Sequence, residues 1–142
     1  MRPLVLAPLL VLTLAFTACG VEFSTGEEGN DFFRKAEVTG SMIVTEPQTA
    51  TIYVQQRYPN EIAIHCTTYR GDTKISDFPD AIVPPHPAGG PTVTPFTFNY
   101  SWDMQYNDPG EYTFECYTRL DEDNFIVEPF TLKPRPTPTP VP

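Results

Sequence analysis

Two alternating stretches, each with a cysteine on its apolar side, restrict the fold of this chain more than any other feature. Residues 110–119 place Cys116 on that side, and residues 61–69 place Cys66 there in the same way. A period of two is the signature of a β-strand with one buried face. The two stretches therefore predict a β-sandwich held by a disulfide. The alternating apolar residues are Tyr112, Phe114 and Cys116 in one stretch, and Ile62, Ile64 and Cys66 in the other.

The composition supports an all-β class. The 142 residues include 17 prolines and 8 glycines, which leave few places for a long helix. The uninterrupted runs are rich in Thr, Val, Ile, Tyr and Phe, the residues enriched in strands. A chain of this length predicts a single domain with extensions at both ends.

The charge of the chain limits its partners. There are 9 basic and 18 acidic residues, a net charge of −9. Removing residues 1–18 removes Arg2 and none of the acids, so the remaining chain carries −10. This balance argues against binding nucleic acid, or an anionic membrane surface, through charge.

The N-terminus has the profile of a signal peptide. A basic start at Arg2 is followed by an almost wholly apolar run from Pro3 to Ala18, and the chain turns polar at Glu22. The run is too short for a membrane span of roughly 20 residues. We therefore expect residues 1–18 to be a signal peptide and the protein to be exported.

The end of this segment resembles the lipobox of bacterial lipoproteins. Residues 14–20 are Leu-Ala-Phe-Thr-Ala-Cys-Gly, in which Phe16 stands where the family usually has leucine. The resemblance implies cleavage before Cys19, lipid attachment to its thiol, and anchoring of the domain to the cell envelope outside the cytoplasm. The alternative is a plain secretory peptide cut near Gly20, which leaves no lipid.

Lipidation explains the odd cysteine count. With Cys19 modified, Cys66 and Cys116 remain for one disulfide, which persists in an oxidising compartment. The loop that it closes, about 50 residues long, makes the bridge worth ~4 kcal/mol in the chain-entropy model.

The composition divides the mature chain into three parts. Residues 19–35 are rich in glycine and acids and predict a flexible tether. Residues 36–132 contain the alternating strands and predict the domain. Residues 133–142 contain alternate prolines, which favour an unpacked polyproline II tail of about 3 Å per residue.

The segment 71–95 is the least regular part of the domain. It contains six prolines and Gly89-Gly90, so short edge strands and a long loop are expected. Long loops on rigid β scaffolds often bind ligands. The alternative is that the prolines protect a sheet edge. The candidate binding residues in and beside this loop are Tyr69, Phe78, Pro84, Pro85 and His86.

The segment 96–104 is the most aromatic strand. Phe96, Phe98, Tyr100 and Trp102 share one face, and small polar residues take the other. We expect these rings to pack in the core, and a carbohydrate-stacking platform is the alternative.

Residues 36–132 resemble an immunoglobulin-like domain. The 50-residue spacing of the cysteines is compatible with a bridge between the second and sixth strands, and residues 108–112 are similar to the family's Asp-x-Gly-x-Tyr motif. Phe114 stands where the family has that tyrosine, two residues before the cysteine, and the usual core tryptophan is missing. The resemblance implies an antiparallel sandwich with an inter-sheet disulfide. The fold implies no activity.

No stretch matches a known catalytic motif, so the chain is not expected to be an enzyme or to need a cofactor. His65 and His86 lack a spaced second metal ligand. Asp121 and Asp123 are weak calcium candidates because their acidic run lacks the ligand spacing of a known calcium loop; an exposed hairpin turn is the alternative.

Three functions follow from these patterns. The favoured one is a non-catalytic, surface-anchored module that binds an envelope protein, a glycan or another extracellular ligand through the loop 71–95. The second is a spacer or assembly subunit whose proline tail meets a neighbour. The third is an envelope enzyme, which would need an acid pair or metal site assembled by the fold, for instance from Asp77, Asp80 and His86.

Overall fold

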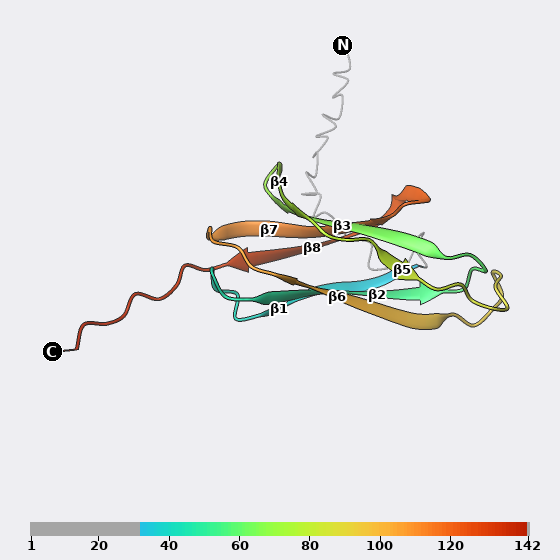
Figure 1. The fold of residues 1–142 in the computed structure, drawn as a ribbon, viewed down its shortest axis with the longest axis horizontal. Coiled ribbons are helices and arrows are strands. Elements are labelled where there is room, and N and C mark those ends of the chain that lie inside the picture. The colour runs from blue at the N-terminus through green and yellow to red at the C-terminus, as the bar shows by residue number, and fades with distance from the viewer. Residues whose placement is uncertain (1–31, 142) are drawn as a thin grey trace, which may run out of the picture.

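The computed structural model describes residues 32–141, which form a sandwich of two antiparallel sheets (Figure 1). The three-stranded sheet has the order β1-β2-β6, and the other sheet has the order β4-β3-β7-β8 with β5 paired to β3. The all-β sandwich is therefore confirmed, and no helix in residues 32–141 could cross a membrane. The strands are β1 Phe33–Gly40, β2 Gln48–Gln56, β3 Ile62–Arg70, β4 Thr73–Asp77, β5 Ala81–Val83, β6 Phe96–Met104, β7 Gly110–Thr118 and β8 Asp121–Leu132.

The core lies between the two sheets and follows the alternation of the strands. In β2, Ala50, Ile52 and Val54 are fully buried, and the residues between them are partly exposed. In β7, Phe114 and Cys116 face them from the other sheet. Apolar side chains at every second position thus make a continuous inner layer, as aligned sheet packing requires.

The predicted disulfide is present, but it lies within one sheet. Cys66 on β3 and Cys116 on β7 are directly opposite each other, with their Cα atoms 4.1 Å apart. The expectation of an inter-sheet bridge is therefore wrong. Opposed residues on adjacent antiparallel strands come close enough for a disulfide, so the cysteine spacing fits both arrangements.

A tyrosine corner leads the chain into β7. The hydroxyl of Tyr112 donates a 2.6 Å hydrogen bond to the backbone carbonyl of Asp108. This contact is the one that the resemblance of residues 108–112 to immunoglobulin-like domains implies. Phe114, two residues further on, is fully buried and packs against Phe78 and Trp102. An aromatic ring thus fills the core position two residues before Cys116.

The aromatic face of β6 is only partly buried. Trp102 and Met104 are buried and Phe98 packs against the core, whereas Tyr100 is 41% exposed. Because β6 is an edge strand, its inner face is not fully covered by the opposite sheet. The expected core packing is therefore confirmed for Trp102, whereas Tyr100 on the same face remains partly exposed.

The domain begins earlier than expected. Phe32 and Phe33 are buried, and the carbonyl of Phe32 accepts a 2.8 Å hydrogen bond from the amide of Gln55. The domain therefore includes Phe32 and Phe33, which lie before the boundary expected at residue 36, because these two large rings pack into the core. The signal peptide and the lipidation site at Cys19 lie outside the described residues.

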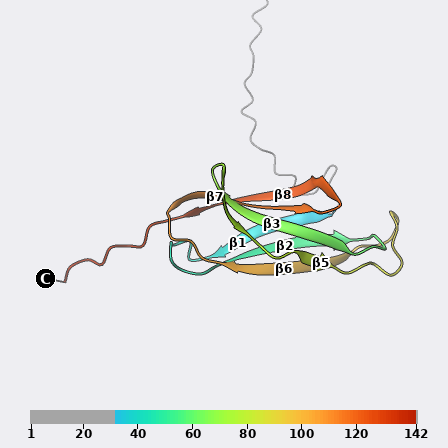
Figure 2. The same ribbon diagram turned by 45° about the horizontal axis from the view of Figure 1, so that its top comes forward.

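Strand β8 ends at the end of the sandwich opposite to the start of β1 (Figure 2). Lys133 pairs with the β1–β2 connection, where its amide donates to the carbonyl of Met42. Beyond it, Arg135 donates a hydrogen bond to the Thr45 hydroxyl. Residues 134–141 are otherwise exposed and have no regular secondary structure.

The disulfide should dominate the stability of the domain. We expect the double variant Cys66→Ala/Cys116→Ala to lose ~4 kcal/mol of unfolding free energy, because its unfolded chain is no longer restricted by a 50-residue loop. Urea denaturation of the full chain measures this loss. The wild-type protein under reducing conditions is the control and should match the variant. Equal midpoints for oxidised, reduced and variant protein would contradict the prediction.

Candidate functional site

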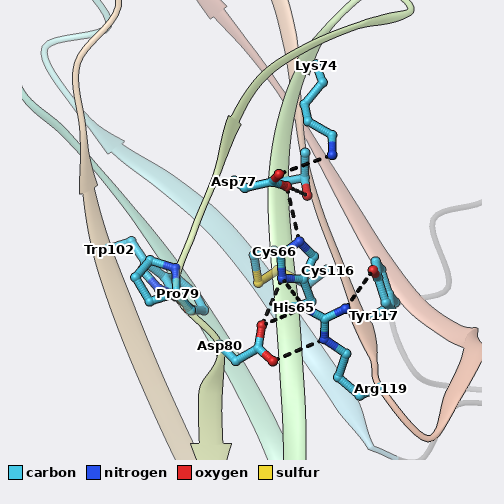
Figure 3. A network of polar contacts seen from close by, with 11 residues as sticks. His65, Cys66, Lys74, Asp77, Pro79, Asp80, Trp102, Cys116, Tyr117 and Arg119 are labelled. Carbon is cyan, nitrogen blue, oxygen red and sulfur yellow. Dashed lines mark hydrogen bonds and ion pairs between the residues drawn. A yellow bond between two sulfur atoms is a disulfide. The ribbon is translucent and has the colours of Figure 1, made fainter.

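The outer face of the five-stranded sheet carries a connected set of polar side chains, here called the polar cluster (Figure 3). Its hydrogen bonds and ion pairs connect strands β3, β4 and β7 with the segments that follow β4 and β7. The members are His65, Thr67, Lys74, Asp77, Asp80, Tyr117 and Arg119.

The disulfide fixes the register that builds this cluster. Because Cys66 lies opposite Cys116, the next pair along, His65 and Tyr117, is also directly opposed. Successive side chains of a strand point to opposite faces, so both rings lie on the outer face when both cysteines are inside. Their ring centroids are 5.5 Å apart.

The two acids come from either side of a pinned linker between β4 and β5. Phe78 packs against Trp102 and Phe114, and its amide donates to the carbonyl of Cys66. The indole Nε1 of Trp102 donates a 3.1 Å hydrogen bond to the carbonyl of Pro79. These inward contacts hold the linker so that the side chains of Asp77 and Asp80 reach His65 from two directions.

His65 lies between two carboxylates. Its Nδ1 is 2.8 Å from Asp80 Oδ1, and its Nε2 is 3.1 Å from Asp77 Oδ1. The ring can donate to both only as the imidazolium. Arg119 Nη2 also lies 3.0 Å from Nδ1, so the neutral ring has a donor available at that nitrogen. The imidazole is therefore held in place in either protonation state, with 13% of its side chain exposed.

Arg119 closes the cluster on one side. Its Nε and Nη2 donate to the two oxygens of Asp80 at 3.0 and 3.1 Å, a bidentate pair. This contact lowers the pKa of Asp80 and raises that of Arg119. The guanidinium also lies 5.8 Å from the ring centroid of Tyr117. Arg119 is thus orientated by a carboxylate and an aromatic face together.

Asp77 is held as a carboxylate by three donors. Thr67 Oγ1 donates to it at 2.8 Å, Lys74 Nζ at 3.1 Å, and His65 faces the same oxygen as Thr67. These hydrogen bonds lower the pKa of Asp77 from 3.8 to about 2, and the one from Thr67 contributes most. At neutral pH the cluster therefore presents two ionised acids matched by Lys74 and Arg119.

The chemistry of the cluster suits recognition by hydrogen bonding. It is ordered, partly exposed and internally matched in charge. Within residues 32–141, no group of three or more His, Cys, Asp or Glu side chains is placed to hold a metal ion. Asp121 and Asp123, the weak calcium candidates, lie at the start of β8, where Asp121 Oδ1 accepts a hydrogen bond from the Asp123 amide.

The structure separates the residues of the predicted binding loop. Phe78 is partly buried and packs against the core, through Trp102 and Phe114. Tyr69 is half-buried on β3, and Pro84 and Pro85 are exposed. His86 stacks on Phe96, and its two ring nitrogens contact the amide of Ala88 and the carbonyl of Thr94. The histidine therefore fixes the shape of the loop.

The acids named in the enzyme hypothesis do come together, but around a different histidine. Asp77 and Asp80 flank His65, and His86 is bonded within its own loop. His65 and Arg119 were not selected as site residues from the sequence. The cysteines could have indicated this site in the sequence. If Cys66 lies opposite Cys116 on antiparallel strands, His65 lies opposite Tyr117 on the outer face.

Comparisons with known proteins give a likeness of fold only. No protein-family model matches the chain, and no curated protein sequence matches it. A superoxide reductase (neelaredoxin) from Ignicoccus hospitalis is 12% identical, with a TM-score of 0.44 over 71% of this chain and 79% of that one. A variant of that enzyme is 11% identical, with a TM-score of 0.47 over 79% and 90%. The CARDB domain of a Pyrococcus furiosus protein, in complex with di-metal ions, is 13% identical, with a TM-score of 0.39 over 77% and 94%.

These similarities correct the expectation that the chain is not an enzyme. A missing catalytic motif does not by itself exclude activity. Two of the structures compared are of an enzyme. Identities of 11–12% and TM-scores below 0.5 carry no superoxide chemistry over to this chain.

The titration of Asp77 tests the geometry of the polar cluster. We expect its carboxyl carbon to titrate at about pH 2 in an NMR experiment, and Thr67→Val to raise this midpoint because the hydrogen bond that contributes most to the lowered pKa is lost. A pKa that is lowered by folding stabilises the protein above the usual value of 3.8, and this contribution is lost as the pH falls toward 2. Between pH 3.8 and about 2, the melting temperature of Asp77→Asn should therefore change less with pH than that of the wild-type protein.

The matched control for that titration is Thr113→Val, which removes a threonine hydroxyl from the neighbouring strand β7. It should leave the Asp77 midpoint unchanged. A wild-type midpoint near 3.8, or equal shifts in the two valine variants, would contradict the geometry described for Thr67.

Proposed function

We propose that the protein is a lipid-anchored envelope lipoprotein whose immunoglobulin-like domain binds another envelope protein or an extracellular ligand. The observation that carries this proposal is the outer face of the five-stranded sheet. There the polar cluster lies between two large apolar side chains, Ile82 on β5, 46% exposed, and Phe125 on β8, 49% exposed.

The composition of this face supports a protein or glycan partner. Arginine and aromatic residues are enriched at the centres of protein interfaces, and Arg119 already lies against Tyr117. Because Asp80 and the aromatic ring hold the guanidinium, little side-chain freedom is lost on binding. The face therefore combines exposed apolar area with hydrogen-bonding groups that are already in position.

The anchor rests on the sequence. Lipid at Cys19 would lie 13 residues before Phe32, the first described residue. A flexible segment of this length spans about 20 Å on average. The outer face would then be held near the membrane surface and remain open to partners beside it.

In-cell photocrosslinking tests the binding face. A photoreactive amino acid in place of Ile82 should capture one recurrent protein or glycan, and the added change Tyr117→Ala should reduce the yield severalfold by removing the support of Arg119. Mass spectrometry identifies what is captured. The control position is Thr51, on the outer face of the other sheet. The same scattered neighbours from both positions would count against a binding face.

The spacer function has one observation in its favour. Strand β1 starts and strand β8 ends at opposite ends of the long axis of the sandwich (Figure 1). With an N-terminal anchor, the proline tail would extend away from the membrane. An element that separates two attachment points needs this arrangement.

Deleting residues 136–142 tests the spacer function and leaves the Arg135–Thr45 contact in place. If the tail meets a neighbour, the deletion should shift the size of membrane-extracted complexes on native gels, and the melting temperature should not change because residues 136–141 are exposed. A second variant replaces residues 136–142 by glycine and serine. It keeps the length of the tail but removes its stiffness, so it shows which of the two properties matters. Unchanged complexes with both variants would dispose of the spacer function.

A further inference from the structure

A groove of about 270 Å³ lies at the end of the sandwich where the chain enters. The β2–β3 turn, the β7–β8 turn and Phe32 form its walls. It is separate from the polar cluster, which lies on the outer face of the sheet. Its apolar lining includes Phe32, Tyr58, Ile62 and Leu120, and its polar lining includes Asp121 and Asn124.

The walls of this groove are fixed before anything binds. The fully buried Gln56 donates to the carbonyls of Asn60 and Pro84 and accepts a hydrogen bond from the amide of Tyr58. On the other side, Thr118 Oγ1 donates to the carbonyl of Asp121 and accepts from its amide. Both turns are thus tied to the ends of strands, which lowers the entropy lost on binding.

The groove leaves apolar surface in water. Leu120 is 77% exposed, and Tyr58 is 41% exposed. The volume is slightly below the ~300–1,000 Å³ of pockets that take drug-sized ligands. A single long side chain fits this space better than a whole small molecule.

The polar groups at the groove are acceptors and anions. Asp121, Glu122 and Asp123 are consecutive at the start of β8, and Glu61 is exposed immediately before β3. Within residues 32–141, Asn124 Oδ1 is buried without a hydrogen-bond donor. A nearby cation, Arg57 on the β2–β3 turn, donates to the carbonyl of Pro91. These groups favour a ligand that carries positive charge and donates hydrogen bonds.

We propose that this groove binds a lysine or arginine side chain from a basic segment of a partner protein. The methylene stem would lie against Tyr58 and Leu120, as long cationic side chains commonly cover apolar surface. The cation would reach the carboxylate of Asp121 and supply the donor that Asn124 Oδ1 lacks. Anionic ligands, including acidic lipid headgroups and phosphates, are repelled by the same carboxylates.

Three fluorescent decapeptides test the proposal on the full chain by anisotropy. The first contains lysines in a glycine-serine background, the second replaces lysine by norleucine, and the third replaces it by diaminopropionic acid. Norleucine keeps the stem without the charge, and diaminopropionic acid keeps the charge without the stem. We expect the lysine peptide to bind at least about fivefold more tightly than either analogue, because it alone has both groups.

Two variants locate the binding. Leu120→Ser should weaken the lysine peptide about tenfold through lost apolar contact, and Asp121→Asn about threefold through lost charge. The asparagine keeps an oxygen that can accept from the Asp123 amide, so the turn is preserved. The matched controls are Ile75→Ser, exposed on β4, and Asp103→Asn, on the outer face of β6, and both should leave binding unchanged.

Each remaining outcome would overturn the proposal. Equal binding of the diaminopropionic peptide would show attraction to the acidic surface as a whole. Equal binding of the norleucine peptide would show an apolar groove with no preference for a cation. If no peptide binds, and Leu120→Ser lowers the fraction of protein that sediments with phosphatidylcholine vesicles, the groove binds a membrane surface instead. Equal effects of the test and control variants would place the peptide elsewhere.

Discussion

The pairing of Cys66 with Cys116 is the constraint on which the rest of the structure depends. A strand has only two faces, so the register of β3 on β7 decides which side chains are inside and which are outside. A slip by one residue would move every side chain to the other face. The covalent bond between directly opposed residues excludes that slip. It therefore sets the core and the outer face of the five-stranded sheet together.

The core and the polar cluster are connected through one short linker. Phe78 and Pro79 are held from inside, by aromatic packing and by the Trp102 indole, while the flanking acids bind His65 outside. A change that loosens Phe78 in the core would also move Asp77 and Asp80. The rigidity of the candidate site is thus supplied by apolar packing on the opposite side of the sheet.

The two ends of the sandwich differ in chemistry. The end with Phe32 has an apolar groove beside consecutive acids, and the opposite end releases a proline-rich tail that carries Arg135. The outer face of the larger sheet carries matched charges and exposed apolar residues. The excess negative charge that the composition shows is thus concentrated in part at one turn, where it can select a cationic partner without disturbing the matched charges of the polar cluster.

The sequence by itself determined the strands, the all-β class and the two cysteines of the disulfide, because alternation and turn residues are local properties of a chain. It also showed the Asp-x-Gly-x-Tyr similarity at residues 108–112, where the structure adds the hydrogen bond from Tyr112 to Asp108. Only the tertiary structure decided that the bridge lies within one sheet, that Phe78 packs against the core and that Phe32 and Phe33 are part of the domain. It also decided that His65 meets Asp77 and Asp80, 12 and 15 residues away. A period of two assigns a residue to a face but not to a neighbour, and the neighbour depends on which strands pair when the loops close.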